Sequence, residues 1–219
     1  MILTQDEYNA KWEFVRSFID ELCIYRVKPN EMPLIGKAPN TFYTWQFYLR
    51  RGLFNHEFLT AVSEMFLQKV YEEYNTFEFQ IAGLETASTP MLAGIPLVAA
   101  KYGLDINAFS IRKNQKEYGI FNWIEGRVNN KPIMLIDDLC SSTMSLSKAL
   151  SVLVQLKLVN ILDRAFCVVN KKNVEDKTQP AIDNHLPEKI KVLYLYSLND
   201  FDLTYGTNKK EDDNDKSKD

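Results

Sequence analysis

Residues 133–145, which read IMLIDDLCSSTMS, decide the fold class of this chain. An apolar run leads directly into Asp137 and Asp138, and a stretch rich in serine and threonine precedes a helical pattern. A short, fully apolar strand is typical of a parallel sheet that is buried on both faces. The stretch therefore predicts a strand, a polar loop at its carboxyl end and a helix.

The flanking sequence repeats this alternation of apolar strands and amphipathic helices. The pattern predicts an α/β fold with a central, mainly parallel sheet flanked by helices. An N-terminal helix over 6–25, an aromatic strand or hairpin over 41–49 and a helix capped by Asn55 precede the sheet. The further predicted strands are 77–83, 106–111, 132–136, 165–170 and 189–198, and the further helices are 88–102, interrupted by Pro96, and 145–158.

Composition narrows the possible classes of function. The chain has 219 residues, 46% of them hydrophobic, and a net charge of -3 without a basic cluster, which argues against a nucleic-acid partner. Neither a signal peptide nor a membrane-spanning run is recognisable, and Cys23, Cys140 and Cys167 lack metal-ligand spacing. We expect a cytoplasmic protein with an N-terminal helix and hood segment (1–60), a core (61–205) and a charged, disordered tail (206–219).

The acidic pair and the hydroxyl-rich loop suggest a ligand site. In open parallel sheets, ligands bind beyond the carboxyl ends of the strands, and a helix N-terminus attracts anions. Two carboxylates followed by such a loop suit a ligand that carries both a diol and a phosphate. The alternative is that Asp138 and Ser142 merely cap the following helix.

The stretch IMLIDDLCSSTMS resembles the PRPP-binding signature of type I phosphoribosyltransferases. Three other segments match that family in the same order: GKAPNTFYTWQF (36–47), IAGLETASTPMLAGIPLVAA (81–100) and IRKNQKEYG (111–119). Together they resemble the orotate phosphoribosyltransferase branch, over about residues 30–175. The resemblance implies the type I phosphoribosyltransferase fold, with a small N-terminal hood over the base.

The resemblance also implies roles for particular residues. Asp137 and Asp138 would bind the ribose hydroxyls close to the positive charge that develops when pyrophosphate leaves, and Mg²⁺ would be held mainly by substrate oxygens. Lys116 would be the principal catalytic lysine, with Arg112 beside it, on a loop (112–119) shared across the subunits of a homodimer. A solvated basic hairpin is the alternative for that loop. The remaining PRPP contacts would come from Glu85, Thr86, Ala87, Lys113, Ser141, Ser142, Thr143, Met144 and Ser145.

The expected base site departs from the family pattern. Leu34 stands where the family has a lysine, so Lys37, or else Arg50 or Arg51, would supply a cation for a base carboxylate. Lys171 replaces a family arginine, and Tyr118 replaces the histidine of the catalytic loop. The aromatic residues that would cover the base are Phe42 and Tyr43.

Thr143 stands where the family usually has glycine. If this position requires a positive φ, a β-branched residue is strained there by roughly 1–3 kcal/mol. We therefore expect the loop to follow another path in which hydroxyl side chains replace backbone donors. The alternative is weakened phosphate binding.

The function expected from the resemblance is Mg²⁺-dependent transfer of the phosphoribosyl group of PRPP to a nucleobase. Orotate is the expected base, which gives orotidine 5'-monophosphate and pyrophosphate in pyrimidine nucleotide biosynthesis. The alternatives are a phosphoribosyltransferase for another base, a non-catalytic PRPP-binding regulator and a nucleotide-binding α/β protein unrelated to PRPP.

Overall fold

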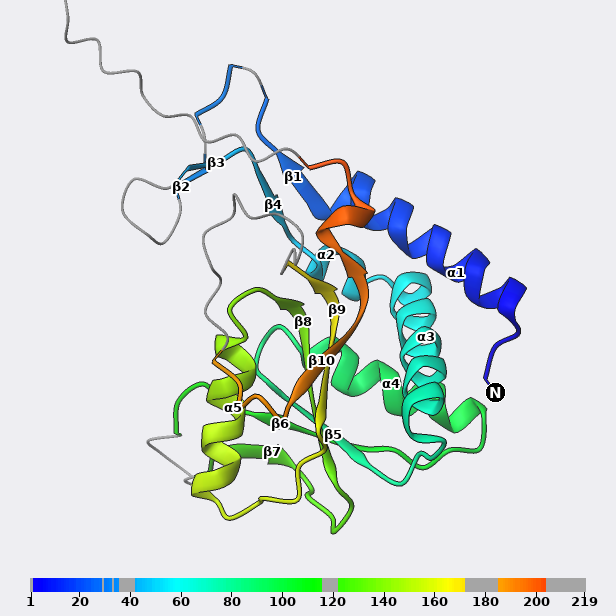
Figure 1. The fold of residues 1–219 in the computed structure, drawn as a ribbon, viewed down its shortest axis with the longest axis vertical. Coiled ribbons are helices and arrows are strands. Elements are labelled where there is room, and N and C mark those ends of the chain that lie inside the picture. The colour runs from blue at the N-terminus through cyan, green and yellow to red at the C-terminus, as the bar shows by residue number, and fades with distance from the viewer. Residues whose placement is uncertain are drawn as a thin grey trace, which may run out of the picture.

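A six-stranded sheet forms the centre of the molecule, as a computed structural model of the chain shows (Figure 1). The structure describes residues 2–28, 30–32, 34–35, 42–115, 122–171 and 185–203. The strand order is β10-β9-β8-β5-β6-β7, and every neighbouring pair is parallel except β6 with β7. The strands are β5 (Gln80–Leu84), β6 (Asn107–Ile111), β7 (Ile124–Gly126), β8 (Ile133–Cys140), β9 (Arg164–Asn170) and β10 (Lys191–Ser197). The predicted α/β fold with a mainly parallel sheet is confirmed.

Helices cover both faces of this sheet (Figure 1). On one face α5 (Met144–Gln155) buries Leu146 and Leu153 against alternate strand residues such as Leu135. On the other face α3 (His56–Tyr74) and α4 (Thr89–Lys101) pack with Met134 and the strands around it. Because side chains alternate along a strand, the continuous apolar run of β8 supplies both layers.

Local capping explains where several helices begin. The side chain of Asn55 accepts hydrogen bonds from the amides of Glu57 and Phe58, so the predicted cap of α3 is confirmed. At the N-terminus of α1 (Gln5–Phe18), Thr4 and Glu7 form a reciprocal capping box.

None of the helices in the described part of the chain combines the length and the apolarity needed to cross a bilayer.

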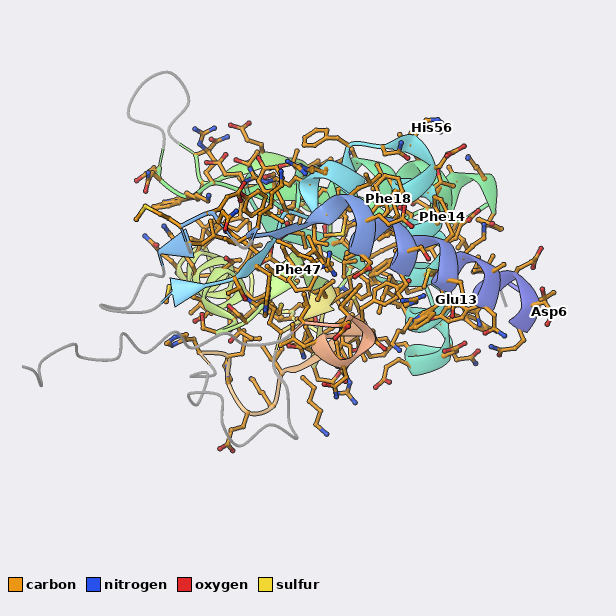
Figure 2. All side chains as sticks on the ribbon, turned by 90° about the horizontal axis from the view of Figure 1, so that it is seen from above. Asp6, Glu13, Phe14, Phe18, Phe47 and His56 are labelled. Carbon is orange, nitrogen blue, oxygen red and sulfur yellow. The ribbon has the colours of Figure 1, made fainter. Side chains whose placement is uncertain are left out.

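The N-terminal segment lies against helix α3, which covers one face of the sheet. Helix α1 packs on α3, with the ring centroids of Phe18 and Phe58 5.0 Å apart. Figure 2 shows Phe14 and Phe18 on the side of α1 that faces His56, the first residue of α3. The short elements that follow α1 are the π-helix η1 (Ile19–Cys23), β1 (Ile24–Arg26), β2 (Leu34–Ile35), β3 (Phe42–Tyr43), β4 (Trp45–Phe47) and α2 (Arg50–Leu53), and a 3-10 helix, η2 (Leu198–Asp200), follows β10.

Two predictions for the N-terminal segment need correction. The helix predicted over 6–25 ends at Cys23, and Ile24 begins a strand because β1 pairs antiparallel with β4. The segment 41–49, predicted as a strand or hairpin, holds two short strands that do not pair with each other, since β3 pairs with β2 while β4 pairs with β1. Both differences arise from pairing between segments that are distant in sequence, which local periodicity does not report.

Strand boundaries in the sheet also differ from prediction. The strand predicted over 77–83 begins only at Gln80, and β7, at the sheet edge, was not predicted. The strand predicted over 132–136 continues to Cys140. Asp137 and Asp138 therefore lie inside β8 rather than beyond its end, because β9 keeps pairing with β8 up to Cys140. The predicted tail (206–219) falls outside the described residues.

Candidate active site

The two aspartates of β8 form one hydrogen-bonded pair. Asp137 is only 5% exposed, whereas Asp138 is half-buried. The amide of Asp138 donates to Asp137 Oδ1 at 3.0 Å, and the two carboxyl groups also hydrogen-bond to each other. The pair thus resolves the repulsion expected of adjacent acids by sharing hydrogen bonds.

Burial controls the protonation of this pair. Burial raises the pKa of Asp137 well above the ordinary carboxyl value, and the charge of Asp138 raises it further. The hydroxyl of Ser145, at the start of α5, lowers the pKa of Asp137 and so partly opposes these effects. Burial also raises the pKa of Asp138, but the charge of Arg50 and the amide of Leu139 oppose this. Burial thus raises the pKa of both carboxyl groups, and the charge of Arg50 favours the ionised form of Asp138.

A cavity of about 260 Å³ opens beside Asp138. It lies where the segment 46–50 approaches the loops that follow β5, β6 and the acidic end of β8. This is the carboxyl edge of the parallel strands, where ligands bind in open α/β sheets. The described residues that line it are Gln46, Phe47, Tyr48, Leu49, Arg50, Thr86, Ala87, Lys113, Asp138 and Leu139.

The loop after β5 is held tightly against β8. A Cβ atom on Gly83 would overlap Ser88 and would lie 2.6 Å from the carbonyl oxygen of Ile136, so only glycine permits this approach. The buried hydroxyl of Ser88 donates to the carbonyl of Leu84 at 2.8 Å. The peptide between Glu85 and Thr86 is cis. The close packing of Gly83 and the hydrogen bond of Ser88 place Thr86 and Ala87 at the cavity.

The predicted pyrophosphate residue Glu85 turns toward the protein. Its carboxylate accepts a hydrogen bond from the amide of Lys113 at 3.1 Å, and its own amide donates to the carbonyl of Ile111 at 2.8 Å. Glu85 therefore fixes the start of the basic loop, while Lys113 lines the cavity. In this structure Glu85 therefore positions the backbone of Lys113.

The basic loop (112–119) is described only at its start, over residues 112–115. Arg112 forms an ion pair with Glu125 of β7, with 3.1 Å between Nη1 and Oε1, and it does not line the cavity. Lys116, the predicted catalytic lysine, and Tyr118 lie outside the described residues. Of the cationic residues predicted for this loop, the structure therefore places Lys113 at the site.

The loop between β8 and α5 keeps the backbone conformation that glycine would allow. Thr143 has φ 55° and ψ 14°, in the left-handed region. Its hydroxyl donates to the carbonyl of Ser142 at 2.7 Å and accepts from the amide of His185 at 3.1 Å. The expectation that the loop follows another path at this residue is wrong, because Thr143 has the positive φ that glycine would allow. The two hydrogen bonds of its hydroxyl help to hold this strained conformation.

The same loop answers the capping question. The N-cap of α5 is Thr143, without a capping hydrogen bond from its side chain, so neither Asp138 nor Ser142 caps this helix. Ser141, Met144 and Ser145 are exposed around the start of the helix, and Ser142 is half-buried. None of residues 141–145 belongs to the described lining of the cavity, although they follow Asp138 directly.

Lys171 is the described member of the predicted base site. Its Nζ lies 5.0 Å from the centroid of the Trp45 ring, and burial lowers the pKa of its ammonium group. Phe42 and Tyr43 form β3, whose backbone pairs with Ile35 and Leu34, but their side chains are outside the described part of the structure. Lys37 also falls outside it.

Sequence reasoning did not assign the segment 46–50 to the PRPP site. The structure separates two adjacent cations that were both considered for the base: Arg50 lines the cavity, and Arg51 does not. The signal was the pair of arginines directly after an aromatic strand. The sequence does not say which arginine faces the cavity, because that depends on how α2 packs beside the loops after β5 and β6.

Curated relatives and solved structures that are similar to this chain are named phosphoribosyltransferases. The chain is 24% identical over 170 residues to an orotate phosphoribosyltransferase of Methanocaldococcus jannaschii, covering 77% of this chain and 85% of that protein. A phosphoribosyltransferase from Corynebacterium diphtheriae has a similar structure, with a TM-score of 0.65 and 19% identity over 87% of this chain and 98% of that one. An orotate phosphoribosyltransferase of Mycobacterium tuberculosis, solved with PRPP, gives a TM-score of 0.58 and 15% identity over 90% and 93% of the two chains. No family profile matches the chain.

These similarities bear on two of the sequence predictions. The solved structures share the α/β architecture over most of both chains, which confirms the predicted phosphoribosyltransferase fold. The curated relative carries the name of the branch that the four motifs resemble, which confirms that resemblance.

Proposed function

We propose that this chain, which has the type I phosphoribosyltransferase fold and is related to the orotate phosphoribosyltransferases, transfers the phosphoribosyl group of PRPP to a nucleobase. One observation carries the proposal. Asp138, Thr86, Ala87 and Lys113 come from three segments that each match a PRPP motif, and they meet around one cavity at the carboxyl edge of the sheet. A nucleotide-binding protein unrelated to PRPP would not require these three motifs around one cavity.

The geometry suits a reaction in which positive charge develops on the sugar. The bond between the anomeric carbon and a pyrophosphate oxygen breaks, and pyrophosphate leaves with the electron pair. A ring nitrogen of the base forms the new bond to that carbon and releases its proton to water. The ionised Asp138 stabilises the cationic carbon through its charge and accepts hydrogen bonds from the ribose hydroxyls. Lys113, across the same cavity, stabilises the negative charge of the leaving group.

Orotate is the proposed base. Its carboxylate requires a cation, and the ammonium group of Lys171 lies beside the aromatic ring of Trp45. The curated relative that matches this chain is named for orotate, which supports the same substrate. The product would be orotidine 5'-monophosphate, so the proposed role is in pyrimidine nucleotide biosynthesis.

Mg²⁺ is the proposed cofactor. Within the described residues, no group of three or more histidine, cysteine or acidic side chains is arranged to hold a metal ion. Mg²⁺ commonly uses one or two carboxylates together with substrate phosphate oxygens. Asp138, a single ionised carboxylate at the cavity, fits that donor set when combined with the oxygens of PRPP. When bound, Mg²⁺ would neutralise part of the charge of the pyrophosphate group.

We further propose a cytoplasmic homodimer whose subunits exchange the loop 112–119. The support is the resemblance of IRKNQKEYG to the family's mobile catalytic loop. Lys116 would then act on the leaving pyrophosphate in the partner's site. A nucleic-acid partner is not proposed, because the chain carries a net charge of -3 without a basic cluster.

The test is pyrophosphate release from PRPP and Mg²⁺ in the presence of a panel of bases, with orotate among them. We expect release with orotate, and we expect Asp138→Asn, at equal protein concentration, to lower it strongly. Binding of PRPP without release for any base would contradict the enzymatic proposal and favour a PRPP-binding regulator. Release with a purine alone would contradict orotate as the base.

A further inference from the structure

Two adjacent arginines share one aromatic ring but have different surroundings. The guanidinium carbon of Arg50 lies 5.2 Å from the ring centroid of Tyr48, and that of Arg51 lies 5.5 Å from the same centroid. Arg51 also donates to the carbonyl of Leu22 at 3.4 Å. Only Arg50 belongs to the described lining of the 260 Å³ cavity. The fold therefore directs one arginine of the pair toward the candidate active site.

The cavity that Arg50 lines corresponds to the PRPP end of the site. Its described lining includes Thr86, Ala87 and Lys113, which match the pyrophosphate motifs, and Asp138, which matches the ribose motif. Lys171, the described cation predicted for the base, is not among the lining residues. A cation in this position therefore faces the sugar and its leaving group rather than the carboxylate of the base.

The pyrophosphate loop itself supplies no cation. Its sequence, ETAS (85–88), contains no lysine or arginine, and its one charged side chain, Glu85, binds the amide of Lys113. A diphosphate that leaves with additional negative charge requires positive charge on several sides. Among the described lining residues, Arg50 and Lys113 are the two that carry it.

We propose that Arg50 binds the pyrophosphate group of PRPP, and so supplies from α2 the cation that the 85–88 loop lacks. This inference rests on the proposed function. A guanidinium presents two parallel N–H donors that match a phosphate group, and the face of Tyr48 orients it. Arg50 also lies close enough to Asp138 for its charge to favour the ionised carboxylate there.

Titration calorimetry with Mg²⁺ present tests the inference with three ligands: PRPP, pyrophosphate and ribose 5-phosphate. Wild-type protein is compared with Arg50→Gln, Arg50→Lys and the matched control Arg51→Gln. We expect Arg50→Gln to weaken binding of PRPP and of pyrophosphate by about tenfold to a hundredfold, as for loss of a charge-assisted hydrogen bond. Ribose 5-phosphate, which lacks the pyrophosphate group, should bind Arg50→Gln and wild type equally. Arg50→Lys should give a smaller loss for PRPP, and Arg51→Gln should match wild type.

The outcomes separate this inference from the proposed function. If wild-type protein binds PRPP and Arg50→Gln binds it equally well, the role of Arg50 is overturned and the proposed function stands. Equal losses for PRPP and ribose 5-phosphate would also overturn it, because Arg50 would then act at the sugar end or through Asp138. Wild-type protein that binds none of the three ligands would overturn the proposed function and this inference together. Arg50 is an exposed residue, so we expect its variants to fold, which thermal unfolding checks.

Discussion

Asp137 and Asp138 are hydrogen-bonded to each other, with the amide of Asp138 3.0 Å from Asp137 Oδ1 and their carboxyl groups also in contact. Their environments differ, since Asp137 is buried among β8, β9 and α5 whereas Asp138 reaches the cavity. These environments predict different functions for two adjacent acids. Asp137 would hold a proton and support its neighbour, and Asp138 would present charge to a ligand.

The first prediction concerns activity. Asp138→Asn should lower kcat/KM for PRPP by about tenfold to a hundredfold, because it removes the charge that faces the cavity. Asp137→Asn should cause a much smaller loss, since asparagine resembles the protonated acid in shape and still offers a donor to Asp138. Steady-state kinetics of the two variants checks this order. Equal losses in both variants would contradict the division of roles.

The second prediction concerns the pH dependence of stability. The pKa of Asp137 is raised in the folded protein above its ordinary value of 3.8, so the folded state binds a proton that the unfolded state has already released. This contribution to stability is fully present below pH 3.8 and is lost as the pH rises toward the raised pKa. Urea unfolding between about pH 5 and about pH 8 should show a smaller fall in stability for Asp137→Asn than for wild type. Identical pH profiles would refute the prediction.

The third prediction concerns Thr143, the strained residue of the loop between β8 and α5. Thr143→Val keeps the β-branch at φ 55° but loses both hydroxyl hydrogen bonds, so it should destabilise the fold by about 1 kcal/mol or more. Thr143→Gly loses the same bonds but relieves the strain of the left-handed conformation. It should therefore be more stable than the valine variant. Urea unfolding at one pH compares them, and a glycine variant less stable than valine would show that strain is not significant here.

The fourth prediction concerns the base. Lys171→Met removes the charge beside Trp45 while keeping much of the apolar side chain. We expect KM for orotate to rise about tenfold, as for loss of a hydrogen bond to a charged group, with KM for PRPP nearly unchanged. Lys171→Arg, which retains the charge, is the matched control. A rise in KM for PRPP instead would place Lys171 at the other end of the site.

The fifth prediction concerns the shared loop. Lys116→Ala should lower turnover far more than it weakens PRPP binding, because its charge would act mainly on the departing pyrophosphate. Co-expression of differently tagged Lys116→Ala and Asp138→Asn chains allows the mixed dimer to be purified. If the loop crosses to the partner, one of its two sites is intact and about half of wild-type activity returns. A mixed dimer as inactive as its two parents would exclude the exchange of loops.

The sequence by itself determined the fold class, the succession of the parallel sheet strands and the segments that carry the chemistry. Apolar runs, helical periodicity and the cap at Asn55 are local signals, and the acidic pair is covalently joined to the loop that follows it. The resemblance of these segments to phosphoribosyltransferase motifs assigned Asp138, Thr86, Ala87 and Lys113 to PRPP before their positions were known.

Only the tertiary structure decided which residues of the motifs reach the cavity. Pairing with β9 extended β8 past both aspartates, the approach of α2 placed Arg50 rather than Arg51 at the site, and the amide of His185 came to hold Thr143. Each outcome depends on contacts between segments far apart in the chain. Such contacts determine how buried a residue is and which charges lie near it. They produce no periodic pattern in the sequence around that residue.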